Sequence, residues 1–247
     1  ESRIKEIKRD IDKMYVILPF EKTFYEDKHH FPVSFVGHPL IDAIQAHPVI
    51  DDATFRKENQ LNDLPIIALL PGSRKQEITK MLSVMLSVAD DFKRYQFVIA
   101  GAPSQEYSFY QQFITSDNIK FLSNKTYDLL QHATAALVTS GTATLETALF
   151  KVPEVVCYKG NWISYQIAKR IITLKYISLV NLIMDKEVVT ELIQDDCNTK
   201  RIASELQKIL EPEHRKIVLE NYRILEEKLG GKGASSTTAK LIVADLK

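Results

Sequence analysis

Two segments of the chain combine small residues, hydroxyl groups and a charge in patterns suited to binding an anion. The first, Leu69-Leu70-Pro71-Gly72-Ser73-Arg74, is an apolar run that ends in a small-residue turn before a helical pattern. Backbone N–H groups at a helix start, the positive end of its dipole, the Ser73 hydroxyl and the Arg74 guanidinium would favour a bound phosphate. Alternatively, Ser73 or nearby backbone only caps the helix and Arg74 is solvated. The segment lacks the Gly-Lys-Ser/Thr ending of a P-loop.

The second segment, Ser140-Gly141-Thr142-Ala143-Thr144-Leu145-Glu146, follows another apolar run and predicts a second strand-to-helix turn. Ser140, Thr142 and Thr144 could donate hydrogen bonds to phosphate oxygens. Glu146 could accept hydrogen bonds from the vicinal hydroxyls of a ribose. Alternatively, Ser140 caps the helix and Glu146 is an exposed carboxylate of its first turn. Two such turns on one sheet predict a site for a nucleoside diphosphate.

Other polar residues offer weaker signals. Asn181 lies inside an apolar stretch at residues 176–183, so its amide needs partners if it is buried. It either binds a substrate or satisfies nearby backbone groups. His38, in Gly37-His38-Pro39, is a candidate acid or hydrogen-bond donor, although a histidine at a domain junction is more often structural. The remaining histidines have no metal-ligand spacing, and we predict no metal: His29, His30, His47, His132 and His214.

The segment at residues 162–175 mixes aromatic and aliphatic residues with Lys169, Arg170 and Lys175. Such a helix could lie at a membrane interface. Most often it is an amphipathic helix packed on its own sheet.

The elements that position these residues follow from the hydrophobic pattern. Short β-type runs occur at residues 15–18, 66–70, 97–100, 119–122, 135–138 and 155–158. Several are apolar throughout, which is typical of strands buried on both faces of a parallel sheet. Apolar residues at helical spacing between residues 78 and 92 predict an amphipathic helix after the second run. The fold class is therefore α/β.

Composition excludes several classes of function. The 247 residues are 45% hydrophobic, which is enough for a packed core. The 32 basic and 32 acidic residues cancel, so no long-range field attracts nucleic acid or an anionic bilayer. The longest apolar run, at residues 66–70, is far shorter than the roughly 18 residues of a membrane span. Cys157 and Cys197 show no metal or disulfide spacing, which favours a cytoplasmic protein.

Turn residues and helical patterns suggest three parts. Residues 1–38 contain too few elements for a doubly wound domain, and we interpret them as the remnant of one with a linker. Residues 39–233 form the main domain, and residues 234–247 form a terminal helix after the Gly230-Gly231-Lys232-Gly233 hinge. The charged start without an initiator methionine suggests that the chain is cut from a longer one.

In their order along the chain, the motifs resemble the carboxyl-terminal part of the bacterial lipid-A-disaccharide synthase family, over nearly all of its 247 residues. The motifs that support the resemblance are Leu18-Pro19-Phe20-Glu21-Lys22, Val36-Gly37-His38-Pro39, Leu70-Pro71-Gly72-Ser73-Arg74 with Glu77, Ser140-Gly141-Thr142-Ala143-Thr144-Leu145-Glu146, Ala168-Lys169-Arg170 and Ser178-Leu179-Val180-Asn181-Leu182.

The resemblance implies a GT-B-type glycosyltransferase with two Rossmann-like domains, of which this chain is mostly the second, UDP-sugar-binding one. It implies transfer of 2,3-diacylglucosamine from UDP-2,3-diacylglucosamine to 2,3-diacylglucosamine 1-phosphate, with release of UDP. Gly72, Ser73 and Arg74 would serve the diphosphate, Glu146 the nucleoside, and Asn181 the cleft. The catalytic residues in this chain would be Arg74 and Asn181, with the general base in the missing domain.

The substrate-binding set would comprise these residues together with Ser140, Gly141, Thr142 and His38. We expect no cofactor, no nucleic-acid partner and peripheral contact with the inner membrane. A homodimer through an exchanged terminal helix is a further expectation.

Two other functions fit parts of the pattern. A UDP-sugar 2-epimerase has a similar two-domain fold and also breaks the anomeric bond to UDP. A non-catalytic module that binds nucleotide sugars is the second alternative.

Overall fold

The computed structural model describes residues 2–160 and 175–246. The Ala168-Lys169-Arg170 motif therefore lies outside the described residues. So does the helix predicted at residues 162–175, except for its last residue. By its internal contacts the chain forms two compact units, residues 1–47 with 223–247 and residues 48–222. These divisions differ from the predicted boundaries at residues 38 and 233. The terminal helix belongs with the first residues of the chain, and the first boundary falls after residue 47.

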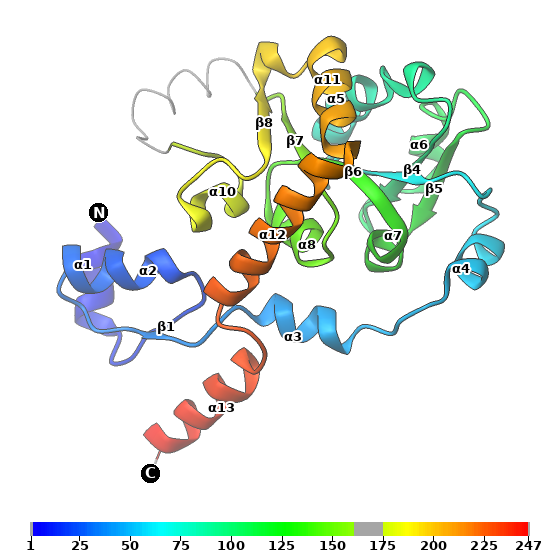
Figure 1. Ribbon diagram of the computed structural model, residues 1–247. Helices are drawn as coiled ribbons and strands as arrows, with labels where there is room; N and C mark the ends of the chain where they lie inside the picture. The colour runs from blue at the N-terminus through cyan, green and yellow to red at the C-terminus, as the bar shows by residue number, and fades with distance from the viewer. Residues whose placement is uncertain (1, 161–174, 247) are drawn as a thin grey trace. The chain divides into compact units, whose positions relative to one another are not determined.

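The larger unit contains a six-stranded sheet with the order β5-β4-β3-β6-β7-β8, in which all neighbouring strands are parallel (Figure 1). The strands are β3 (Ile66–Leu70), β4 (Gln96–Gly101), β5 (Ile119–Ser123), β6 (Ala133–Thr139), β7 (Glu154–Tyr158) and β8 (Thr190–Ile193). The α/β class predicted from the apolar runs is confirmed. The pattern missed β8, because polar Thr190 and Glu191 begin this short strand at the edge of the sheet.

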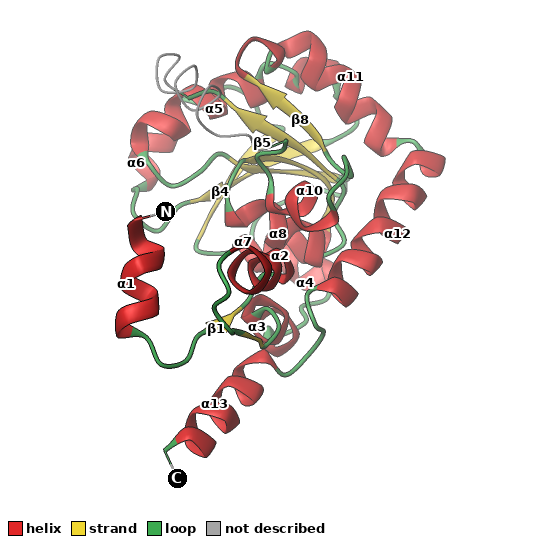
Figure 2. Cartoon of the chain, turned by 90° about the vertical axis from the view of Figure 1, so that its left-hand side faces the viewer, coloured by secondary structure: helices red, strands yellow, loops and turns green. Residues whose placement is uncertain are grey.

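Helices cover both faces of this sheet (Figure 2). Ile67 and Leu69 of β3 share one apolar cluster with residues of α5 (Lys75–Leu86) and α11 (Thr199–Leu210). Ile66 and Ala68 share another with residues of α7 (Thr126–His132). All five residues of β3 are buried, as a strand covered on both sides requires. Among the described residues, the helices of this unit are α4 (Asp52–Glu58), α5 (Lys75–Leu86), α6 (Tyr107–Gln111), α7 (Thr126–His132), α8 (Thr142–Leu149), α10 (Leu179–Met184), α11 (Thr199–Leu210) and most of α12 (Pro212–Lys228), with 3-10 turns at Ala89–Asp91 and Gln194–Asp196.

The smaller unit contains two short parallel strands and several helices. Its elements are α1 (Ser2–Asp10), β1 (Tyr15–Val16), α2 (Pro19–Thr23), a π-helical turn at Phe24–Lys28, β2 (Ser34–Phe35), α3 (Pro39–Ala46) and α13 (Ala234–Asp245). The predicted terminal helix is confirmed as α13. Asp42 of α3 accepts hydrogen bonds from the backbone N–H groups of Gly233 (2.7 Å) and Ser235 (2.9 Å), which attaches the start of α13 to α3.

Candidate functional site

A cavity of about 260 Å³ lies where β3, β4 and β6 end, and both predicted turns line it. The carboxyl ends of strands are where open α/β sheets bind their ligands. Six predicted site residues come together here: Gly72, Ser73, Ser140, Gly141, Thr142 and Glu146. The loop after β4 supplies another wall, at Ala102 and Pro103, which the sequence analysis did not single out.

The turn after β3 is closed by Glu77, a residue of the first turn of α5. The backbone N–H of Ser73 donates to Oε2 of Glu77 at 3.3 Å, so this group is not free for an anion, contrary to the expectation of open N–H groups. Gly72 has φ +96°, and a Cβ atom there would overlap the same carboxylate oxygen. The left-handed backbone therefore favours glycine at position 72, and any side chain there would also force the Glu77 carboxylate to move. Arg74, not Ser73, is the N-cap residue, and its side chain makes no cap hydrogen bond.

The turn after β6 is built differently from both predicted alternatives. Gly141 is the N-cap residue of α8, while the Ser140 hydroxyl donates to the carbonyl oxygen of Ile177 at 2.9 Å. Thr144 is fully buried, and its hydroxyl donates to the carbonyl oxygen of Gly141 at 2.9 Å. The prediction that Thr144 donates to a phosphate is therefore wrong, because its hydroxyl closes the helix start. Thr142 is exposed and lines the cavity.

Glu146 lies on the cavity wall beside a tyrosine that the sequence analysis missed. The Tyr127 hydroxyl donates to Oε1 of Glu146 at 2.8 Å. Burial raises the pKa of the Glu146 carboxyl above its ordinary value, while the hydrogen bond from Tyr127 acts in the opposite direction. Burial and the neighbouring carboxylate also raise the pKa of Tyr127, which keeps this hydroxyl protonated as a donor. The second oxygen of Glu146 leaves a carboxylate acceptor for ligand hydroxyls.

Arg74 lines a second cavity, of about 470 Å³, that shares Glu77 and Thr139 with the first. Arg74 does not line the first cavity. The second cavity also contains three lysines, from two elements: Lys75 and Lys80 of α5, and Lys159 directly after β7. Four cationic side chains around one hollow make a local positive site in a chain whose formal charge is zero.

Asn181 is fully buried and lines neither cavity. Its amide nitrogen donates to the carbonyl oxygen of Val189 (2.8 Å) and to Glu191 (2.9 Å). Its amide oxygen accepts from the N–H groups of Val188 (2.7 Å) and Val189 (3.0 Å). These four bonds use the hydrogen-bonding capacity of an amide. Of the two roles left open by the sequence, the geometry favours satisfaction of nearby backbone.

His38 belongs to the smaller unit, whereas both cavities belong to the larger one. It is the N-cap residue of α3, and its Nδ1 accepts from the backbone N–H of Leu40 at 3.2 Å. Burial lowers the pKa of His38, which favours the neutral ring that this cap needs. The structure thus gives His38 a capping role.

Within residues 2–160 and 175–246, no three His, Cys, Asp or Glu side chains gather as metal ligands would. In the same part of the chain, no helix has the length and apolar character needed to cross a membrane.

Comparison with known proteins identifies the family to which the chain belongs. A profile of the lipid-A-disaccharide synthetase family matches residues 1–243. The chain belongs to this family. It is 39% identical, over its full length, to the lipid-A-disaccharide synthase of Syntrophus aciditrophicus, and 35% identical over 98% of its length to that of Geobacter sulfurreducens. The chain spans 66% and 64% of the lengths of these two relatives.

Solved structures show the same fold at low sequence identity. The calicheamicin glycosyltransferase CalG4 aligns with a TM-score of 0.57 at 17% identity, covering 98% of this chain and 56% of CalG4. The UDP-GlcNAc 2-epimerase from Neisseria meningitidis, bound to UDP-GlcNAc, aligns with a TM-score of 0.56 at 14% identity, covering 88% of this chain and 61% of that structure. These similarities confirm the Rossmann-like GT-B fold class. The resemblance to epimerases is one of fold alone.

Proposed function

We propose that the chain is the donor-binding part of a glycosyltransferase that makes the lipid A disaccharide. The complete enzyme would transfer 2,3-diacylglucosamine from UDP-2,3-diacylglucosamine to 2,3-diacylglucosamine 1-phosphate, giving the disaccharide 1-phosphate and UDP. The main support is the meeting of both strand-to-helix turns and Glu146 in one cavity. Family membership supports the reaction, and the fold shared with an epimerase bound to UDP-GlcNAc supports the ligand class.

The two cavities suggest a division of the donor. The first would take the uridine, with Glu146 accepting hydrogen bonds from the ribose hydroxyls beside the Ser140 turn. The diphosphate would lie toward the second cavity, where Arg74 contributes a guanidinium fork. Lys80 and Lys159 would add positive charge at the same end.

The reaction needs this charge because glycosyl transfer develops negative charge on the departing UDP. Fixed cations and donors that meet this charge lower the barrier more than they stabilise the bound substrate. Arg74 would therefore act on the leaving group. Asn181 would act indirectly, through the loop at Val188 and Val189, because its amide is already hydrogen-bonded to protein groups. The general base that deprotonates the acceptor hydroxyl would come from the part of the enzyme outside this chain.

One further feature belongs to the proposal. The acyl chains of both substrates would bring the complete enzyme to the inner-membrane surface as a peripheral protein on the cytoplasmic side.

Between the alternatives, family membership favours the synthase over a 2-epimerase. A module that only binds nucleotide sugars would have the same donor site. It would differ from the synthase because the complete protein would not transfer the sugar in an activity assay.

The donor assignment is tested by comparing UDP with uridine as calorimetric ligands. Arg74→Ala should weaken UDP about tenfold or more, because it removes a charge-assisted contact to phosphate, and should leave uridine nearly unchanged. Arg94→Ala is the matched control, since Arg94 is an exposed arginine in the turn before β4, at the opposite end of the strands. An equal loss of affinity for UDP and uridine would show that Arg74 does not serve the diphosphate.

A further inference from the structure

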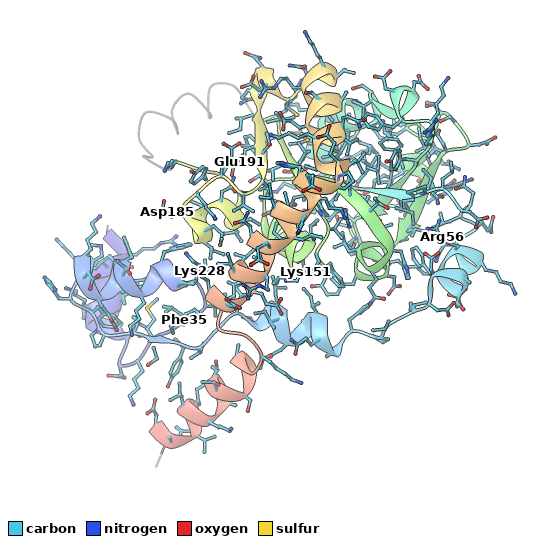
Figure 3. All side chains as sticks on the ribbon, in the orientation of Figure 1. Phe35, Arg56, Lys151, Asp185, Glu191 and Lys228 are labelled. Carbon is cyan, nitrogen blue, oxygen red and sulfur yellow. The ribbon has the colours of Figure 1, made fainter. Side chains whose placement is uncertain are left out.

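Glu191 is a carboxylate on the edge strand β8 that the sequence analysis did not single out (Figure 3). Its two oxygens accept four hydrogen bonds from the loop before α10 and from α10 itself. The donors are the N–H of Ile177 (2.8 Å), the N–H of Ser178 (2.9 Å), the hydroxyl of Ser178 (2.7 Å) and the amide of Asn181 (2.9 Å). Hydrogen bonds to an ionised carboxylate are about twice as strong as neutral ones. The Glu191 side chain therefore fixes the backbone at Ile177 and Ser178, where the chain enters α10.

This loop is also hydrogen-bonded to a residue that lines the first cavity. The carbonyl oxygen of Ile177 accepts the hydrogen bond from Ser140, whose turn lines the first cavity. Ile177 thus has its N–H bound to Glu191 and its carbonyl bound to Ser140. Ser178 is fully buried, while the hydrogen bonds of Ile177 to Glu191 and Ser140 are partly buried. A continuous set of hydrogen bonds joins β8 to the turn that opens α8.

We propose that Glu191 is a positioning residue for the donor site, which it serves by holding the Ile177–Ser178 loop that orients the Ser140 turn. This inference rests on the proposed function for the ligand, and on hydrogen bonds within one compact unit for the linkage. Glu191 lines neither cavity, so its effect on a ligand must pass through Ile177 and Ser140. Placement of binding groups by such supporting hydrogen bonds is a general requirement of preorganised sites.

Glu191→Gln tests the linkage with little change in volume. An amide offers one accepting oxygen where the carboxylate offers two, so the N–H groups of Ile177 and Ser178 cannot both keep their partner. We expect UDP to bind about tenfold more weakly, as a loss of about 1.4 kcal/mol would give. The matched control is Glu205→Gln on α11, whose carboxylate accepts from the hydroxyl of Thr190, the neighbour of Glu191 on β8, at 3.1 Å. The control should bind UDP like the wild-type chain.

A double-mutant cycle with Ser140→Ala separates positioning from a general loss of stability. If Glu191 acts through the Ser140–Ile177 bond, Glu191→Gln should weaken UDP little further once Ser140 has been replaced. If the double variant instead loses UDP affinity by the product of the two single losses, the proposal is overturned. Unchanged UDP affinity in Glu191→Gln would do the same.

Amide hydrogen exchange provides a readout that needs no ligand. Glu191→Gln should speed exchange at Ile177, at Ser178 and in residues 140–142, and Glu205→Gln should not. Faster exchange at 177–178 without a change at 140–142 would contradict the linkage. If the wild-type chain itself fails to bind UDP, the proposed function fails, while exchange at 140–142 still decides the role of Glu191. If Glu191→Gln does not fold, Ser178→Ala removes one donor to Glu191 with the backbone intact, and the same exchange pattern is expected.

Discussion

Glu146 shows how a single residue in this site combines burial with a defined hydrogen bond. Its carboxyl is partly buried and has a raised pKa, and one of its oxygens is held by Tyr127. A free glutamate ionises near pH 4.3. Glu146 therefore loses its proton at a higher pH than an exposed glutamate would. Only the ionised form is a pure acceptor for ribose hydroxyls.

This difference predicts a pH dependence of donor binding. UDP affinity should be reduced at low pH, where Glu146 is protonated, and should rise as pH increases through its raised pKa. Glu146→Gln should lose this component, so the ratio of wild-type to variant affinity grows with pH. Because ionisation of UDP itself affects both proteins equally, the ratio isolates the side chain.

Tyr127→Phe provides the second arm of this calorimetric experiment. Its hydrogen bond lowers the pKa of Glu146 against the effect of burial, so its removal should shift the rise in affinity to higher pH. Parallel pH profiles for the wild-type chain and Glu146→Gln would show that Glu146 does not contact the ligand.

At the scale of elements, the turn between β3 and α5 depends on glycine for two separate reasons. The backbone of Gly72 is left-handed, and the carboxylate of Glu77 occupies the place of a side chain. Gly231 has the first property without the second, since φ is +65° and no atom lies within 4 Å of the position of its Cβ. Substituting each glycine by alanine therefore distinguishes the cost of the left-handed backbone from the cost of the contact with Glu77.

We expect Gly231→Ala to lower the free energy of unfolding by about 1–2 kcal/mol, the cost of a left-handed alanine. Gly72→Ala should cost about 1 kcal/mol more, because Glu77 must move and the Ser73 N–H loses its acceptor. Urea unfolding measures both. In a Glu77→Ala background the additional cost at position 72 should disappear. Equal destabilisation by the two glycine substitutions would argue against the closed turn.

At the scale of the whole molecule, the described residues contain a six-stranded parallel sheet with the candidate donor site at the carboxyl ends of its strands. It spans only 66% of the length of its Syntrophus aciditrophicus relative. We propose that the general base belongs to the part of the enzyme outside this chain. Donor binding and transfer should therefore be separable in this polypeptide.

We expect the 247-residue chain to bind UDP but to form no detectable disaccharide from the two diacylglucosamine substrates. Stabilising the leaving group does not deprotonate the acceptor or hold it in line. The assay is disaccharide formation, with the complete relative from Syntrophus aciditrophicus as the positive control. Transfer by the chain at a rate comparable with this control would contradict the division of roles.

Much of the fold was predictable from local pattern. Runs such as residues 66–70 and 135–138 lack polar residues, which is typical of short strands covered on both faces of a sheet. The two small-residue turns after β3 and β6 were also visible, because glycine and hydroxyl residues mark the passage from strand to helix. Parallel pairing then places both turns at one edge, so six site residues could be named in advance.

The sequence by itself thus determined the α/β class and placed the candidate site at the carboxyl ends of the strands. Tertiary structure alone decided what each polar group does there. The Ser140 hydroxyl is bound by Ile177, 37 positions away, Glu146 by Tyr127, 19 positions away, and Asn181 by the β8 segment. Arg74 faces a second cavity together with Lys159, from a different strand end. The physical reason is that periodicity records burial, whereas a hydrogen-bond partner depends on which distant segments the fold brings within about 3 Å.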